Sequence, residues 1–185
     1  MLNSSNHTVE GVRSHISYKR HIQILYFNAR SLIPKLDELR VLCDLRKPDI
    51  VCITESWLCE DIGSLECSIH GYHCVRCDRH RHGGGVLLFI SDQLESHVIL
   101  CGPNQLELLL VSVHNTNHPN HKLYIGVWYK PPDNLDALDS LYSVLENLDV
   151  SIFSRFLLVG DFNIDFSNKQ HPHFYKLLSI LDSFF

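Results

Sequence analysis

Three apolar stretches of the sequence each run directly into a polar side chain that can bind a cation or move a proton. The stretch "ILYFN" ends on Asn28, "DIVCITE" ends on Glu55, and "RFLLVGD" ends on Asp161. A polar or charged side chain without a partner costs free energy at the end of a buried strand, so the presence of each of these residues needs an explanation. Any one of them alone fits a residue that forms a turn at the end of a strand. The three together indicate a shared site.

The chemistry open to this set follows from its ligand atoms. The carboxyl ends of buried strands in α/β proteins border a crevice, which is where such proteins place their sites. Two carboxylates and an amide form an oxygen-rich pocket that suits Mg²⁺ or Mn²⁺ better than zinc. Asn163 follows Asp161 by two residues, so in an extended chain both side chains face the same way. One could activate a water while the other donates a hydrogen bond to a developing oxyanion.

The hydrophobic pattern predicts the elements that position these residues. Strands are predicted at 21–28, 49–55, 83–91, 106–114, 122–132 and 155–160, and helices at 31–49, 135–148 and 171–185. The turn-like residues 115–121 predict an antiparallel pair, and Pro131 and Pro132 end its second strand. Residues 56–82 are expected to be irregular. Strands outnumber helices, and the two types alternate in blocks along the chain. This order predicts an α/β (α+β) sandwich of sheets covered by helices.

The first two predicted helices carry apolar faces at helical spacing. Ser31 is expected to cap the first helix. The apolar face of the first helix is formed by Leu32, Leu36, Leu39 and Cys43, and that of the second by Leu135, Leu138, Tyr142, Leu145 and Leu148.

Composition limits the class of protein. The chain has 185 residues, 45% of them hydrophobic and 20% charged, which fits one domain with a sizeable core. We expect a flexible polar segment at 1–20 and a domain at 21–185. A net charge of −5 excludes binding of nucleic acid through the overall charge of the protein, so any phosphate must be bound by a local group of basic residues.

The sequence also predicts where in the cell the protein is located. It shows no signal peptide and no apolar run long enough to cross a membrane. Its seven cysteines have no framework-like spacing. They therefore predict a reduced intracellular protein, nuclear or cytoplasmic and not secreted, whose cysteines mostly fill the core.

Basic residues gather before the glycine run 83–85. Arg76, Arg79 and Arg81 are candidates for phosphate contacts, and Lys130 is a weaker one. A solvated basic loop is the competing interpretation.

The same segment offers a zinc interpretation through Cys74, Cys77, His80 and His82. The two cysteines have the right spacing. The histidines follow too closely to wrap a structural zinc site, which disfavours zinc.

Five ordered blocks carry a resemblance to a known family. They are "YFNARSL", "DIVCITESWL", "CDRHRHGGGVLLFI", "GVWYKPP" and "LLVGDFNID". Over about residues 20–183 the chain resembles the endonuclease/exonuclease/phosphatase family, within it most the apurinic-endonuclease-like endonuclease of non-LTR retrotransposons. The resemblance implies a four-layer α/β sandwich with two central mixed sheets, and Mg²⁺- or Mn²⁺-dependent cleavage of DNA phosphodiesters at the sheet edge.

The resemblance also implies roles for single residues. Asn28 matches the asparagine of the metal and phosphate pocket, and Glu55 matches the metal-ligand glutamate. Tyr129 matches the tyrosine that contacts the phosphate. Asp161 matches the residue that orients or deprotonates the attacking water, and Asn163 the amide that stabilises the oxyanion. A phosphodiester transition state spreads negative charge over its oxygens, so a cation and fixed donors would stabilise it.

The sequence departs from the family pattern near its end. Family members complete the site with a late Ser-Asp-His block, whereas this sequence contains no such triplet. We therefore expect an incomplete domain that lacks the last strands, with weak or no cleavage by the chain alone. Arg30 also stands where DNA-repair members carry an acid.

Two further functions stay open. One is a phosphatase of the same fold that acts on phosphoinositides or sphingomyelin, against which the retrotransposon-like blocks argue. The other is a non-catalytic remnant or a nucleic-acid- or protein-binding module. The sequence predicts no membrane association, and nothing in it implies a partner protein. The resemblance suggests a former fusion to a reverse transcriptase.

Overall fold

The computed structural model describes residues 21–79, 83–102, 106–132, 134, 136–171 and 173–184. The segment 1–20, expected to be flexible, lies outside the described residues. The assignment of 21–185 as one domain stays a prediction.

Two four-stranded mixed sheets form the centre of the molecule. The first has the order β1-β2-β4-β3 and the second β5-β6-β7-β8. Within them β1 pairs with β2 and β7 pairs with β8 in parallel, and the other pairings are antiparallel. The strands are β1 (Ile24–Asn28), β2 (Ile50–Thr54), β3 (Tyr72–Cys77), β4 (Val86–Ser91), β5 (Leu94–Cys101), β6 (Glu107–Asn115), β7 (Leu123–Tyr129) and β8 (Phe156–Asp161).

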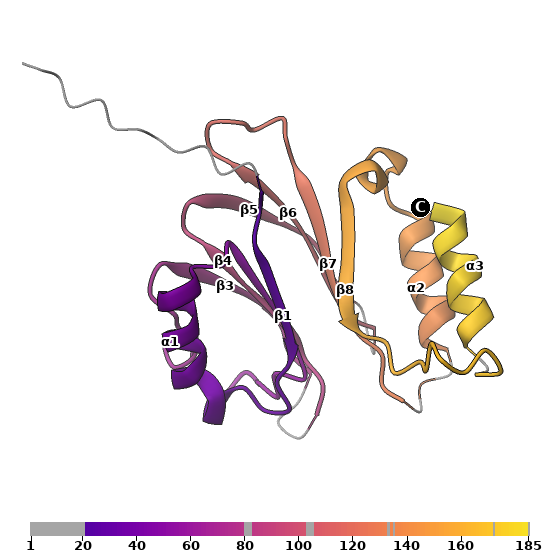
Figure 1. Ribbon diagram of the computed structural model, residues 1–185, viewed down its shortest axis with the longest axis horizontal. Helices are drawn as coiled ribbons and strands as arrows, with labels where there is room; N and C mark the ends of the chain where they lie inside the picture. The colour runs from indigo at the N-terminus through magenta and orange to yellow at the C-terminus, as the bar shows by residue number, and fades with distance from the viewer. Residues whose placement is uncertain are drawn as a thin grey trace, which may run out of the picture.

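Helices cover the outer faces of both sheets. Figure 1 shows α1 on the far side of the first sheet, and α2 with α3 on the far side of the second. The helices are η1 (Ile33–Lys35), α1 (Leu36–Arg46), α2 (Ala137–Glu146), η2 (Val150–Arg155) and α3 (Phe174–Phe184). The arrangement is a four-layer α/β sandwich, which confirms the fold expected from the resemblance. No helix among the described residues is both long and apolar enough to span a bilayer.

Each interface between layers has its own apolar core. Leu36, Leu39 and Cys43 of α1 pack on the first sheet. Residues of β2, β4, β6 and β7 meet between the two sheets. The second sheet packs on α2 and α3 around the fully buried Trp128. The nearly continuous apolar runs of β2, β4 and β6 follow from this placement, because both faces of these strands are covered.

The helix faces were predicted well, with two corrections. All four residues of the first predicted face are buried. Ser31 does not cap this helix, because its φ of 78° places it in a left-handed loop and η1 begins two residues later. In α2 the buried face contains Leu141, whereas Tyr142 is 38% exposed. Leu135 lies outside the described residues.

The sequence prediction missed two strands, β3 and β5. Both lie at the edge of their sheet. Every residue of β3 is half-buried, and β5 is mostly exposed with an irregular register between Val98 and Leu100. Both strands carry polar residues among the apolar ones, so neither shows the continuous or alternating apolar pattern that marked the other six strands. The edge position alone is not the reason, because β1 and β8 are also edge strands and were predicted.

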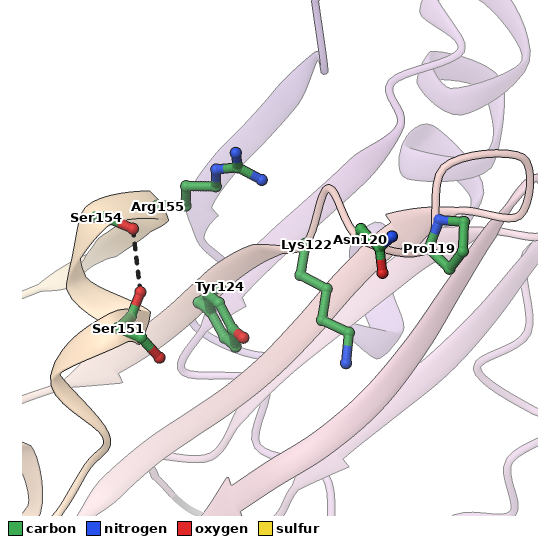
Figure 2. Close-up of a pocket in the computed structure, with 7 residues that line it drawn as sticks. All are labelled: Pro119, Asn120, Lys122, Tyr124, Ser151, Ser154 and Arg155. Carbon is green, nitrogen blue, oxygen red and sulfur yellow. Dashed lines mark hydrogen bonds between the residues drawn. The ribbon is translucent and has the colours of Figure 1, made fainter.

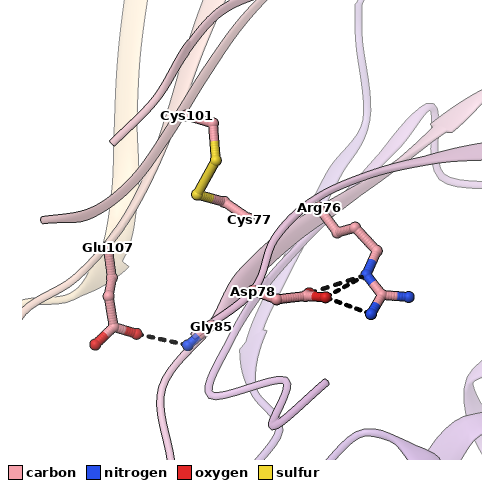
Figure 3. The surroundings of a disulfide bond; sticks show 6 residues. All are labelled: Arg76, Cys77, Asp78, Gly85, Cys101 and Glu107. Carbon is pink, nitrogen blue, oxygen red and sulfur yellow. Dashed lines mark hydrogen bonds and ion pairs between the residues drawn. A yellow bond between two sulfur atoms is a disulfide. The ribbon is translucent and has the colours of Figure 1, made fainter. Parts of the chain in front are cut away.

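A disulfide between Cys77 and Cys101 links the edge strands β3 and β5, and so ties the two sheets together (Figure 3). The expectation of wholly reduced cysteines is therefore wrong for this pair. It also removes Cys77 from the zinc interpretation, whose His80 and His82 lie outside the described residues. Cys43, Cys52 and Cys67 are buried and fill the core as predicted.

Candidate active site

The amide of Asn28 joins two carboxylates from different sheets. Its Nδ2 atom donates to Glu55 Oε1 at 2.7 Å and to Asp161 Oδ2 at 2.8 Å. Asn28 ends β1 and Asp161 ends β8, while Glu55 follows directly after β2. The parallel pairing of β1 with β2 brings Asn28 and Glu55 to one edge, and the packing of the two sheets brings Asp161 to the same place. The three strand-ending residues singled out in the sequence thus meet at one site.

The register of the second sheet adds two residues beside this cluster. Tyr129 is the pairing partner of Asp161 on one side and of Glu107 on the other. Partners in register point to the same face of a sheet, so the three side chains form a row. Glu107 was not selected from the sequence. A carboxylate inside the apolar run "LELLLV" was the signal that could have identified it, because a buried charge needs partners.

The surroundings keep the Tyr129 phenol protonated. Burial raises the pKa of Tyr129 to about 12, and the negative charges of Glu55, Glu107 and Asp161 add to the rise. Burial likewise raises the pKa of Tyr26, whose hydroxyl lies 3.2 Å from Thr54 Oγ1. At neutral pH Tyr129 is therefore a hydrogen-bond donor and not a base.

Left-handed backbone is concentrated in the loops around the site. Among the described residues, six non-glycine residues have positive φ, and five of them follow β1, β2 or β8. These five are Arg30, Ser31, Glu55, Trp57 and Asn163. Backbone hydrogen bonds hold these loops, for instance from Ser31 N to Glu55 O at 3.0 Å and from Trp57 N to Gly84 O at 3.0 Å. Such conformations are costly for non-glycine residues and cluster at functional sites.

Asn163 reaches the site by a turn and not by an extended chain. Strand β8 ends at Asp161, and Asn163 has a φ of 47°. Its backbone N–H donates to Asp161 Oδ1 at 3.2 Å, and its side-chain amide donates to the carbonyl oxygen of Lys130 at 2.7 Å. The expectation that extended spacing aligns the two side chains is thus wrong. The turn instead brings Asn163 next to the carboxylate through the backbone.

Two of the basic candidates are used inside the protein. Arg76 forms an ion pair with Asp78 (Figure 3) and donates to the carbonyl oxygens of Ile62 at 2.9 Å and Cys59 at 2.7 Å. Lys130 is fully buried, with its ammonium 3.2 Å from the carbonyl oxygen of Pro131. These contacts favour structural roles for both side chains. A phosphate contact by either stays a prediction.

Among the basic candidates that the structure describes, Arg79 is the most exposed. Its side chain is 42% exposed and lies 2.7 Å from the buried carboxylate of Glu107. Glu107 also accepts from the backbone N–H of Gly85 at 2.5 Å. A Cβ at Gly84 would lie 2.2 Å from Glu107 Oε2, and one at Gly85 2.6 Å from Ser56 Oγ. The glycines therefore permit a close approach, but to neighbouring protein groups. Arg81 lies outside the described residues.

The ligand atoms at the site fit a small divalent cation. Within the described part of the chain no cluster of three or more His, Cys, Asp or Glu residues has the arrangement of a metal site. Mg²⁺, however, keeps several waters and needs only one or two protein carboxylates. Glu55 offers a carboxylate and Asn28 an amide oxygen, both of them hard oxygen ligands, and Asp161 lies beside them.

Structural comparison shows which known fold this architecture matches. Solved structures with the same architecture have the endonuclease/exonuclease/phosphatase fold. The resemblance recognised in the sequence motifs is therefore confirmed at the level of the fold. No protein-family model and no curated protein sequence matches the chain.

Three of these solved structures are nucleases by name. The endonuclease domain of TRAS1, a telomere-specific non-LTR retrotransposon, is 15% identical with a TM-score of 0.67, and the match covers 89% of this chain and 71% of that one. An AP endonuclease from Archaeoglobus fulgidus is 19% identical with a TM-score of 0.58, covering 78% and 58%. The 3'-5' exonuclease NExo from Neisseria meningitidis is 16% identical with a TM-score of 0.60, covering 86% and 70%.

Proposed function

We propose that the chain is a phosphodiester-cleaving endonuclease-type domain that acts on DNA with Mg²⁺ or Mn²⁺. The observation that carries the proposal is the Asn28 amide, which joins a carboxylate of each sheet at 2.7 and 2.8 Å. The nuclease neighbours support a reaction at a phosphodiester, and NExo bound to a product DNA hairpin supports DNA as the ligand.

The proposed roles follow from the chemistry of each side chain. Glu55 and Asn28 would hold the cation, which when bound neutralises charge on the phosphate. Asp161 would orient or deprotonate the attacking water. The protonated phenol of Tyr129 would donate to a phosphate oxygen. Asn163 would stabilise the oxyanion with the second hydrogen of its amide, since the first is used on the Lys130 carbonyl.

The activity proposed for the chain alone is weak or absent. The sequence contains no Ser-Asp-His triplet. The chain spans 58% to 71% of the length of the three solved structures described above. Groups that act as a unit lose most of their rate when one member is removed. A former fusion to a reverse transcriptase stays a prediction, because the likeness to the TRAS1 domain is one of fold.

Cation binding and cleavage are tested separately. Calorimetric titration with Mn²⁺ should show one site that is lost in Glu55→Gln, while the exposed Glu38→Gln on α1 retains it. Unchanged binding in Glu55→Gln would contradict the cation site. Supercoiled plasmid with Mg²⁺ should be nicked slowly or not at all, and any nicking should vanish in Asp161→Ala. Fast nicking that depends on Asp161 would refute the weak activity and support the assigned site.

A non-catalytic nucleic-acid-binding module is the second candidate, favoured by the missing Ser-Asp-His triplet. Such a module would bind a DNA duplex with an affinity that falls steeply with salt, because phosphate contacts release counterions. Binding of this kind without any nicking at high enzyme concentration would favour it over the nuclease.

A further inference from the structure

A second pocket lies at the end of the second sheet opposite the candidate active site. It has a volume of about 360 Å³ between the β6–β7 hairpin and η2. Figure 2 shows its lining residues, which are Pro119, Asn120, Lys122, Tyr124, Ser151, Ser154 and Arg155. Tyr124 pairs with Phe156 at the start of β8, whereas Tyr129 pairs with Asp161 at its end. Five residues of strand separate the two ends by roughly 17 Å.

The pocket and the candidate active site also lie on opposite faces of β7. Successive side chains of a strand alternate between faces, so Tyr124 shares its face with Trp128 and not with Tyr129. Trp128 packs in the core toward α2 and α3, while Tyr129 packs between the two sheets. A ligand in the second pocket would therefore be separate from any substrate at the Asn28 cluster.

The pocket concentrates positive charge in an otherwise acidic protein. Lys122 and Arg155 are exposed and come from two segments that are far apart in the sequence. Neither forms an ion pair with any described carboxylate. The two lining segments, 115–124 and 150–156, contain no Asp or Glu, although the chain has a net charge of −5. The local field thus favours an anion.

One acidic residue lies next to the lining segments, and its carboxylate is used in a hydrogen bond to the backbone. Asp149 precedes η2, and its carboxylate accepts from the backbone N–H of Ser151 at 2.8 Å. Hydrogen bonds from Ser151 lower the pKa of this carboxyl group. Asp149 therefore caps η2 and is not among the residues that line the pocket.

The uncharged lining residues add an aromatic surface and hydroxyl groups. Tyr124 is half-buried, and Figure 2 draws its ring between the η2 residues and Lys122. An aromatic face beside cations is the combination on which proteins stack nucleic-acid bases. The Ser154 hydroxyl donates to Ser151 O at 3.0 Å and keeps its oxygen as an acceptor. The side chains of Ser151 and Asn120 supply further polar groups.

We propose that this pocket binds a nucleotide, with its base against Tyr124 and its phosphate neutralised by Lys122 and Arg155. The volume lies within the range of small-molecule sites, about 300–1,000 Å³. A free mononucleotide and one nucleotide of a single strand present the same chemistry, and the experiment separates these two sources.

The test is a calorimetric titration of the full chain with AMP, adenosine and inorganic phosphate. AMP should bind more tightly than either of its parts. Lys122→Ala and Arg155→Ala should each weaken AMP binding about tenfold, because each removes one charge-assisted contact. Tyr124→Leu should weaken AMP binding and leave phosphate binding unchanged. The exposed Arg46→Ala on α1 is the matched control and should behave like the parent chain.

The same variants identify the source of the nucleotide. A single-stranded oligonucleotide that binds more tightly than AMP, and loses affinity in Arg155→Ala, assigns the pocket to a strand. If AMP and the oligonucleotide bind with equal affinity, the pocket is a site for free nucleotides. Asp161→Ala should leave AMP binding intact, so failure of this proposal is distinguishable from failure of the proposed nuclease. AMP and oligonucleotide binding that is absent, or unaffected by Lys122→Ala and Arg155→Ala, would overturn the proposal.

Discussion

The side-chain amide of Asn28 in β1 donates a hydrogen bond to the carboxylate of Asp161 in β8, over 2.8 Å. These residues are 133 positions apart and belong to different sheets. The bond therefore couples the packing of the two sheets to the geometry of the candidate active site. A change in how the sheets pack would separate Asp161 from the residues that end β1 and β2.

Removing the Asn28 amide should destabilise the protein even without any substrate. Asn28→Ala leaves two partly buried carboxylates without their shared donor, which should cost about 1–3 kcal/mol of the free energy of unfolding. Urea denaturation measures the loss. Asn120→Ala, an exposed asparagine in the β6–β7 hairpin, should cost much less. Equal effects of the two substitutions would show that the Asn28 bonds do not stabilise the fold.

Gly160 should tolerate no side chain. A Cβ there would lie 1.8 Å from the carbonyl oxygen of Trp128, in the strand that pairs with β8. Gly160→Ala must displace backbone next to Asp161, so we expect a loss of about 3 kcal/mol or more. Gly63→Ala places its Cβ 3.4 Å from Glu66 Oε1 and should have little effect. Thermal unfolding compares the two variants, and similar melting temperatures would contradict the expected clash.

The titration of Tyr129 should be visible in the alkaline range. Its pKa is about 12 in the folded chain against 10.0 for the ordinary side chain. The unfolded chain therefore releases this proton first, and the stability contributed by Tyr129 is lost as pH rises from 10 to 12. Tyr129→Phe should flatten the decline in that window. The pKa of Tyr72 is also about 12, so the tyrosinate absorbance of the two phenols overlaps. The Tyr129 signal is obtained as the difference between the spectra of the parent chain and Tyr129→Phe, both recorded in EDTA to keep metal ions out of the site. A Tyr129 signal that titrates near pH 10 would contradict the burial and charges described.

The disulfide between Cys77 and Cys101 should stabilise the sandwich. It closes a loop with a sequence separation of 24 residues, for which loop-closure entropy gives about 3 kcal/mol. Guanidinium denaturation with and without reductant measures this contribution. Cys77→Ser should show the reduced stability under both conditions, while Cys59→Ser should match the parent chain. Peptide mapping that finds no linked Cys77 and Cys101 peptides would refute the bond.

Among the described basic candidates Arg79 has the most exposed side chain, so we expect it to contact DNA. Arg79→Ala should weaken binding of a DNA duplex and lower the slope of log affinity against log salt by about 1, as expected for one lost phosphate contact. Arg40→Ala is the matched control, because Arg40 is also exposed and pairs with an acid, Asp37 at 2.8 Å. An unchanged salt slope in Arg79→Ala would show that Arg79 makes no phosphate contact and serves only as the ion-pair partner of Glu107.

The apolar pattern of the sequence determined the helices and every strand except β3 and β5. Strands β2, β4 and β6 are covered on both faces, so burial forces continuous apolar runs that can be recognised without a structure. The same pattern marked Asn28, Glu55 and Asp161, since a polar residue stands out directly after such a run. The edge strands β3 and β5 have no comparable pattern, because both carry polar residues among the apolar ones.

The tertiary structure alone decided which polar groups are available for a ligand. The sequence does not distinguish Arg76 from Arg79, but packing buries most of the Arg76 side chain and leaves the Arg79 side chain 42% exposed. Packing also buries Lys130, the weaker candidate. The place of Glu107 beside Tyr129 depends on strand register, and the Cys77–Cys101 bond depends on which sheet edges meet. These are contacts between residues distant in the chain. Local patterns fix the strands and their polar ends, whereas the packing of the two sheets fixes their partners.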